Sequence, residues 1–122
     1  MNYQETLAYL YQKLPVFHRI GAAALKPGLD NITALCEALG NPHRQLKCIH
    51  VGGTNGKGST SHLLSAVLQS AGYNVGLHTS PHLRSYTERF KINGRPCDES
   101  VVSDFVTAPR ALIEEIQPSF CE

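Results

Sequence analysis

The stretch Gly53-Thr54-Asn55-Gly56-Lys57-Gly58-Ser59 decides the fold that the sequence predicts. A short apolar segment, residues 47–51, precedes it, and residues 58–71 after it carry apolar side chains at helical spacing. A second short apolar segment covers residues 74–78. Strand, glycine loop, helix and strand in this order have the length of a βαβ unit, about 30 residues. The sequence therefore predicts an α/β fold with a P-loop-type parallel sheet and flanking helices.

The composition of this loop favours the binding of a polyphosphate. Glycines allow the backbone to curl so that successive N–H groups point into one concavity, and the helix that begins there adds the positive end of its dipole. Lys57 supplies a mobile positive charge that can reach the outer phosphates. The alternative is a tight turn that serves packing alone, with Lys57 in solvent.

The residues after the lysine depart from the usual P-loop. In that motif a Ser or Thr follows the lysine directly, and its hydroxyl reaches Mg²⁺. Here Gly58 intervenes before Ser59, Thr60 and Ser61. The generic motif therefore leaves open which hydroxyl contacts a phosphate or the metal, and it disfavours a common GTPase or kinase.

Polar side chains follow residues 74–78, and ligands gather at the carboxyl ends of strands in open α/β sheets. Thr79 and Ser80 offer hydroxyl oxygens to Mg²⁺. His78 and His82 have the spacing of zinc ligands on a helix, but Pro81 disfavours a helix there. The charged side chains that either position an anionic substrate or remain solvated are Arg84, Glu88 and Arg89.

The N-terminal third predicts two helices. Asn2 and Glu5 form a capping pair for the first helix, which Pro15 ends. Its expected apolar face consists of Leu7, Leu10, Tyr11 and Leu14. A second helix is expected from about residue 31, with Asp30 as its N-cap and Gly40-Asn41-Pro42 at its end.

The C-terminal third predicts a hairpin and a final helical stretch. Asn93-Gly94 is a strong two-residue hairpin turn, and the return strand passes through residues 95–97. Asp98 can cap the last helical stretch, which Pro109 breaks or restarts.

Composition bounds the class of protein. The chain has 122 residues, 42% hydrophobic and 17% charged, with a formal net charge of +1. These values allow a globular core and argue against a nucleic-acid-coating surface or a polybasic membrane anchor. No apolar run reaches the roughly 20 residues of a membrane span, and no secretory signal is visible. The four cysteines lack a C-x-x-C spacing, so we expect packed, reduced thiols in a cytoplasmic protein.

Three motifs together resemble one family. Residues 53–59, then Ser80-Pro81-His82-Leu83, then Tyr86-Thr87-Glu88-Arg89 followed by Asn93-Gly94, look like folylpolyglutamate synthase/dihydrofolate synthase, the folate branch of the Mur ligase superfamily. The glycine after Lys57 is more similar to the folate branch than to the cell-wall ligases. The resemblance spans nearly the whole chain, and it implies the central ATPase domain of a Mur ligase.

This resemblance implies an ATP-dependent acid–amino-acid ligase of folate biosynthesis and one-carbon metabolism. Such an enzyme phosphorylates a carboxylate of dihydropteroate or the γ-carboxyl of a (tetrahydro)folate, and the amine of L-glutamate then attacks the acyl phosphate. ATP and Mg²⁺ are therefore implied. A cytoplasmic monomer is expected, with no nucleic-acid or membrane partner.

The resemblance also implies particular site residues. Lys57 is the implied catalytic residue and Ser80 the implied Mg²⁺ ligand. The residues that match the ATP-binding positions are Thr54, Asn55, Gly56, Lys57, Gly58 and Ser59. The residues that match substrate-binding positions are Lys26, Pro27, Gly28, Leu29, Ser119, Phe120, Cys121 and Glu122. Cys121 departs from the aromatic residue usual at its position.

Members of this family are several times longer, so residues 1–122 are expected to be a truncated N-terminal part of the ATP-binding domain. The C-terminal domain is then absent, and a glutamate and a histidine that complete the Mg²⁺ shell lie beyond the chain. We expect weak nucleotide binding and no ligase turnover from these residues alone. Two alternatives stay open, a non-catalytic P-loop nucleotide-binding module and a cell-wall Mur-type ligase. Whether such an enzyme makes dihydrofolate, extends polyglutamate or does both also stays open.

Overall fold

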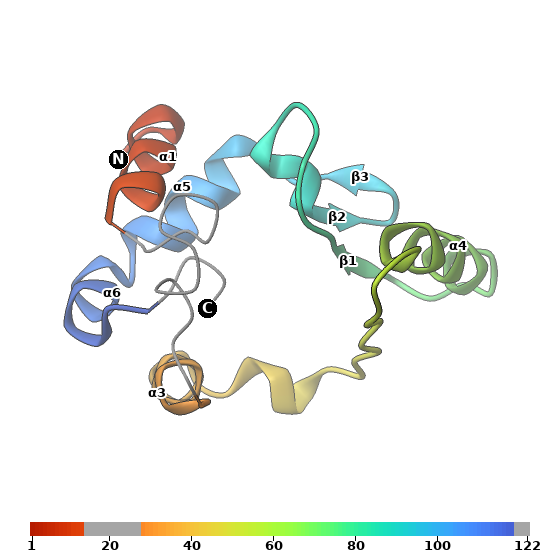
Figure 1. Cartoon of the computed structure of the whole chain (residues 1–122), viewed down its shortest axis with the longest axis horizontal. Helices are drawn as coiled ribbons and strands as arrows, with labels where there is room; N and C mark the ends of the chain where they lie inside the picture. Colours follow the sequence, from red (N-terminus) through yellow and green to blue (C-terminus); the bar gives the residue numbers. More distant parts are fainter. Residues whose placement is uncertain (14–27, 119–122) are drawn as a thin grey trace. The chain divides into compact units, whose positions relative to one another are not determined.

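The computed structural model describes residues 1–13 and 28–118, and Figure 1 shows their helices and strands. The α-helices are α1 (Tyr3–Lys13), α3 (Asp30–Ala38), α4 (Lys57–Ser70), α5 (Glu99–Thr107) and α6 (Arg110–Ile116). The strands are β1 (Gly76–His78), β2 (Phe90–Ile92) and β3 (Arg95–Pro96). Two short 3₁₀ helices, η2 (Pro42–Gln45) and η3 (Tyr86–Arg89), lie between them in sequence.

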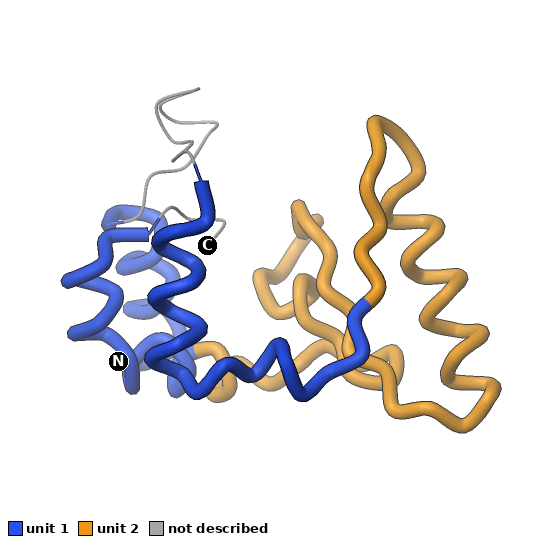
Figure 2. The backbone as a smooth tube through the Cα atoms, turned by 90° about the horizontal axis from the view of Figure 1, so that it is seen from below, with its two compact units in different colours: residues 1–48, 103–122 blue, residues 49–102 orange. Residues whose placement is uncertain are grey.

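The chain divides into two compact units, coloured separately in Figure 2. Unit 1 combines residues 1–48 with residues 103–122, so segments from both ends of the sequence share one packed body. Unit 2 is the continuous stretch 49–102. The glycine loop, helix α4 and all three strands belong to unit 2.

Helix α1 begins where the sequence predicts. The Asn2 side-chain oxygen accepts from the backbone N–H of Glu5 (2.9 Å), and the Glu5 carboxylate accepts from that of Asn2 (3.0 Å). This reciprocal pair is a capping box, so the predicted Asn2–Glu5 pair is confirmed. Of the predicted face, Leu10 is buried and Leu7 and Tyr11 are half-buried, whereas Leu14 and Pro15 lie outside the described residues. Thr6 and Tyr9 are buried in addition. Thr6 can be buried because its hydroxyl donates to the Asn2 carbonyl (2.8 Å).

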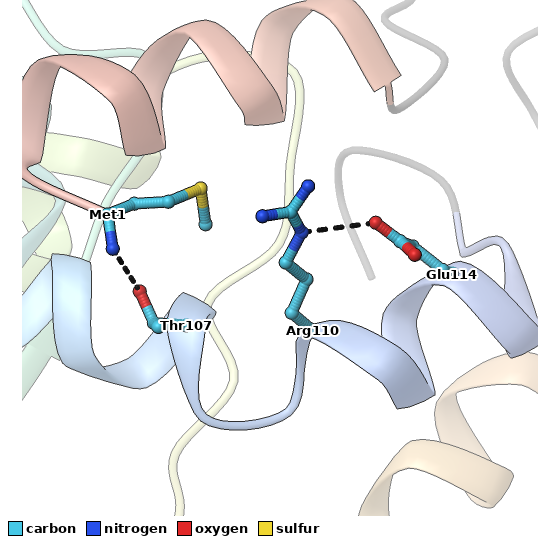
Figure 3. A network of polar contacts seen from close by, with 4 residues as sticks. All are labelled: Met1, Thr107, Arg110 and Glu114. Carbon is cyan, nitrogen blue, oxygen red and sulfur yellow. Dashed lines mark hydrogen bonds and ion pairs between the residues drawn. The ribbon is translucent and has the colours of Figure 1, made fainter.

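Unit 1 is completed by contacts between distant parts of the sequence. Helices α3 and α6 contact each other, and the buried apolar side chains of the unit are Tyr9, Leu10, Leu35 and Val106. The N-terminal amino group donates to the Thr107 hydroxyl at 3.5 Å, and Arg110 pairs with Glu114 at 3.1 Å (Figure 3). The Arg110 guanidinium also lies 5.0 Å from the centre of the Tyr9 ring. These contacts tie the first helix to the last two.

Helix boundaries elsewhere follow local signals. The α3 helix begins at Asp30, one residue before the expected start, with Leu29 at the N-cap. Gly40 (φ 82°) and Asn41 (φ 53°) then adopt left-handed backbone, and their N–H groups bond to carbonyls of the last turn. Pro109 stands at the N-cap of α6, so it separates α5 from α6 as predicted. No helix in the described residues has both the length and the apolarity of a membrane span.

The sheet of unit 2 is antiparallel. Strand β1 pairs with β2, placing Leu77 opposite Lys91, and β2 pairs with β3, placing Ile92 opposite Arg95. Asn93 (φ 50°) and Gly94 (φ 81°) form the turn with both residues left-handed, which confirms the predicted hairpin. Helix α4 contacts β1.

The predicted parallel sheet is wrong for the described residues. Residues 47–51 are not a strand, and residues 76–78 pair with 90–92 in antiparallel register. The prediction paired two apolar segments on either side of a helix, whereas β1 finds its partner in the hairpin that follows it. A strand forms only where a second segment hydrogen-bonds to it, and residues 47–51 have no such partner among the described residues. Ile49, in the middle of this segment, is 63% exposed.

The apolar face of α4 is also only partly buried. Leu64 and Leu68 are half-buried as expected, and Ser65 is buried between them. Leu63 and Val67, predicted on the same side, are 70% and 65% exposed. The face that packs is therefore narrower than the apolar pattern.

Candidate functional site

The glycine loop has a backbone that only glycine adopts easily. Gly53 has a φ of 152° and Gly56 a φ of 77°, and both values lie in the region that L side chains rarely enter. Gly56 is the N-cap residue of α4, so the left-handed residue is the one that turns the chain into the helix. The predicted junction of glycine loop and helix is present, although the strand expected before it is not.

The N-terminus of α4 has no side-chain cap among the described residues. The first N–H groups of a helix have no partner within it and carry partial positive charge. Here they begin at Lys57, the first helical residue. Because Gly56 contributes only its carbonyl, which accepts from Thr60 N–H at 2.9 Å, no side-chain oxygen competes for these donors. An anion with several oxygens suits this position.

Lys57 folds back over the loop. Its ammonium donates to the Gly53 carbonyl at 2.5 Å, which places the charge beside the first residue of the loop. Ser61 donates to the Lys57 carbonyl at 2.8 Å, so the Ser61 hydroxyl is directed back along the helix. The predicted ATP-binding residues 54–59 are all exposed.

Ser80 lies in an exposed position two residues after β1. A hydroxyl oxygen is a suitable ligand for a hard cation such as Mg²⁺. Among residues 1–13 and 28–118, no group of three or more His, Cys, Asp or Glu side chains could hold a metal ion.

His78, at the end of β1, and His82, four residues later, both contact Arg89. The Nδ1 atom of His78 lies 3.0 Å from the Arg89 carbonyl, and the Arg89 Nε–H donates to Nδ1 of His82 at 2.9 Å. The Arg89 guanidinium also lies 5.1 Å from the centre of the Tyr86 ring. One ring nitrogen of each histidine is thus engaged by protein.

Glu88 is a functional candidate whose role the sequence prediction left undecided. Its carboxylate accepts from three consecutive backbone N–H groups, those of Leu83 (3.1 Å), Arg84 (2.9 Å) and Ser85 (2.6 Å). These bonds, led by that from Ser85, hold the pKa of Glu88 below its ordinary value of 4.5. The signal was present in the sequence, because Ser85 and Glu88 have the S-x-x-E spacing of a capping box.

The predicted substrate-binding residues are only partly described. Lys26 and Pro27 lie outside the described residues, as do Ser119, Phe120, Cys121 and Glu122. Gly28 has a φ of 84°, and Leu29, 72% exposed, precedes α3. These two residues belong to unit 1, whereas the glycine loop and Ser80 belong to unit 2.

The described cysteines are free thiols. They are Cys36, Cys48 and Cys97. Cys48 is exposed, whereas Cys97 is partly buried and this burial raises its pKa. Cys121 lies outside the described residues.

Comparison with known proteins shows first that the chain is similar to one segment of longer, folate-related synthases. No family model matches it. Folylpolyglutamate synthase of Lacticaseibacillus casei is 38% identical over 117 residues, which are 96% of this chain and 26% of that protein. Dihydrofolate synthase/folylpolyglutamate synthase of Bacillus subtilis is 33% identical over 93% of this chain and 25% of its own length.

Solved structures agree with these relatives. The crystal structure of folylpolyglutamate synthase from Thermotoga maritima is 40% identical, with a TM-score of 0.83 over 97% of this chain and 27% of that one. A folylpolyglutamate synthase complex with AMPPCP and folate has a TM-score of 0.80 at 39% identity, covering 96% of this chain and 27% of that one. The chain is homologous to folylpolyglutamate synthase/dihydrofolate synthase over nearly its whole length, and it spans about a quarter of the curated relatives it matches.

Proposed function

We propose that these residues form the phosphate-binding part of an ATP-dependent ligase that adds L-glutamate to dihydropteroate or to the γ-carboxyl of a folate. The observation that carries the proposal is the junction of the glycine loop and α4. There an uncapped helix N-terminus, a left-handed Gly56 and the folded-back Lys57 ammonium converge. A homologue in complex with AMPPCP and folate supports the choice of ATP and of a folate-type acceptor.

In this proposal each part of the loop has a role. The N–H groups at the start of α4 hold phosphate oxygens, and Lys57 leaves the Gly53 carbonyl to neutralise charge on the transferring γ-phosphoryl group. Thr54, Asn55, Gly56, Gly58 and Ser59 line the nucleotide phosphates. The acceptor carboxylate becomes an acyl phosphate, and the glutamate amine displaces phosphate to form the amide.

Ser80 is the proposed protein ligand of Mg²⁺, which would screen the charge of the phosphates when it is bound. Lys26, Pro27, Gly28 and Leu29, together with Ser119–Glu122, are the proposed contacts to the pterin-bearing substrate. The proposal treats residues 1–122 as the N-terminal part of the ATP-binding, Mur-ligase-like domain of a cytoplasmic, monomeric enzyme. Other parts of the ligase would supply the glutamate site.

A segment exchange tests the proposal. The 117 residues of the Lacticaseibacillus casei enzyme that align with this chain are replaced by this chain, and glutamate-dependent ADP release is measured. We expect turnover with a folate acceptor. Lys57→Ala should lower it by about one to two orders of magnitude, because one charge-assisted hydrogen bond to the transferring phosphate is lost.

Lys47→Ala is the matched control, since Lys47 is an exposed lysine outside the glycine loop, and its turnover should equal that of the parent. Full turnover of the Lys57→Ala variant would remove Lys57 from the mechanism. A chimera that folds, as judged by circular dichroism, yet releases no ADP with either acceptor would contradict the ligase assignment. Comparing dihydropteroate with tetrahydrofolate in the active chimera then separates the two activities.

A further inference from the structure

Ser80 sits in a short segment that the protein holds from both sides. On its N-terminal side, the N–H of Thr79 donates to the Arg89 carbonyl at 3.1 Å, which extends the pairing of β1 with β2 by one residue. On its C-terminal side, Nδ1 of His82 accepts from the Arg89 Nε–H at 2.9 Å. Backbone and side chain of one residue therefore fix the chain immediately before and after Ser80-Pro81.

The rest of the loop is held by the neighbour of Arg89. Both carboxylate oxygens of Glu88 are occupied by backbone N–H groups from residues 83–85. Ser85 in turn contacts Thr87 through their hydroxyls (2.8 Å), and Thr87 is only 7% exposed. The loop from Ser80 to Ser85 is thus bonded to three residues of the following element η3, namely Thr87, Glu88 and Arg89.

These contacts leave Glu88 little capacity to bind a ligand. A carboxylate whose two oxygens already accept three bonds has few lone pairs remaining. The Arg89 guanidinium likewise donates its Nε–H to His82 and lies over the face of Tyr86. Both side chains are built into the protein's own loop, which differs from the expectation that they either position a substrate anion or stay solvated.

We propose that Arg89 and Glu88 are positioning residues that hold the Ser80 hydroxyl in place for a divalent cation bound with the ATP phosphates. The proposal rests on the proposed function, in particular on Ser80 as the Mg²⁺ ligand. Partners that hold a metal ligand in place typically change metal affinity about 10–100-fold when they are removed. The same residues need contribute nothing to the binding of phosphates by the glycine loop itself.

The test compares the ATP affinity of the chimera described above in Mg²⁺ and in EDTA, using a fluorescent ATP analogue. We expect Arg89→Ala to reduce the ratio of the two affinities by about tenfold, while affinity in EDTA is unchanged. Glu88→Gln should reduce the ratio in the same direction. Arg95→Ala is the matched control, because Arg95 is an exposed arginine on β3 and should leave the ratio intact.

A double-mutant cycle with His82→Ala shows whether Arg89 acts through its bond to His82. If it does, the double variant should lose no more than Arg89→Ala alone, and His82→Ala, which leaves the Arg89 side chain in place, should by itself lower the ratio. Additive effects would overturn the assignment, as would equal losses in Mg²⁺ and EDTA. Amide exchange of β2 checks that the sheet stays folded in each variant.

The outcomes distinguish the positioning role of Arg89 and Glu88 from the proposed role of Ser80 as the Mg²⁺ ligand. If the unmodified chimera gains affinity from Mg²⁺ and Ser80→Ala removes the gain while Arg89→Ala keeps it, the positioning role is wrong and Ser80 stands. If Mg²⁺ gives the unmodified chimera no gain, the assignment of Ser80 falls and the positioning role falls with it.

Discussion

Two glycines of the loop, Gly56 and Gly58, differ in backbone conformation and therefore in the side chains they tolerate. Gly56 has a φ of 77°, whereas Gly58, two residues later, lies within α4 at ordinary helical backbone. A Cβ at either position would meet no atom within 4 Å. Conformation alone therefore distinguishes these two glycines, and the two positions make a clean comparison.

We expect Gly56→Ala to destabilise unit 2 by about 1–2 kcal/mol, because an L residue in left-handed backbone crowds its own carbonyl. Gly58→Ala should be neutral or stabilise by up to about 1 kcal/mol, since alanine is the better helix former. Urea unfolding followed by circular dichroism measures both changes. Equal effects of the two substitutions would contradict the assigned backbone of the loop.

The ionised Glu88 carboxylate gives the loop a pH dependence. Its pKa is lowered in the folded protein by the backbone N–H donors, so its stabilising effect is complete above the unfolded value near 4.5 and is lost as pH falls through the lower, folded value. We expect amide protection of Leu83, Arg84 and Ser85 to decline below about pH 4.5, as measured by NMR exchange. In Glu88→Gln the protection should be weak at every pH; full protection at neutral pH would refute the role of the charge.

At the scale of elements, the hairpin of β2 and β3 is fastened to the preceding segment by its turn. The Asn93 side-chain oxygen accepts from Val75 N–H at 2.8 Å, and its amide donates to the Asn74 side chain at 3.2 Å. The backbone N–H of Asn93 also donates to the Val75 carbonyl at 2.9 Å. A turn residue therefore extends the pairing of β1 with β2.

Asn93→Ala should cost about 1–2 kcal/mol, because alanine tolerates left-handed backbone less well and leaves Val75 N–H without this acceptor. Asn74→Ala removes only the longer contact and should cost a few tenths of a kcal/mol at most. Amide exchange of Val75 and Leu77 reports the change directly. Unaltered exchange in Asn93→Ala would show that the turn does not hold β1.

At the scale of the whole chain, the two units have separate sources of stability. The packing of unit 1 depends on Leu10, which is 7% exposed, and on residues from the C-terminal helices. The sheet of unit 2 depends on strand pairing within residues 76–96. Residues without shared partners have nearly additive effects, so damage to one unit should leave the other in place.

Leu10→Ala should destabilise unit 1 by about 2–5 kcal/mol, the usual cost of truncating a buried leucine. Amide exchange in β1 and β2 should remain that of the parent. Leu63→Ala is the control, since Leu63 is 70% exposed and its loss should change stability by no more than about 0.5 kcal/mol. A parallel loss of protection in both units would show that they unfold as one.

Features that depend on a few neighbouring residues were predictable from the sequence. The Asn2–Glu5 capping box and the left-handed turn at Asn93-Gly94 are confirmed, and the helix expected from about residue 58 begins at Lys57. Each depends on bonds or backbone angles within about five residues, where spacing along the chain is also spacing in space. The family resemblance was readable for the same reason, because its motifs are short.

Only the tertiary structure decided which segments meet. The sequence by itself determined that residues 74–78 could form a strand, but their partner is 90–92 in antiparallel register, and residues 47–51 have no strand partner among the described residues. The bond from Arg89 to His82 was equally hidden, although both residues stood in recognised motifs. Apolar pattern sets what a segment can bury and residue type sets what a side chain can bind. Which strand or side chain becomes its partner is decided by the tertiary structure, because the partner comes from a distant part of the sequence.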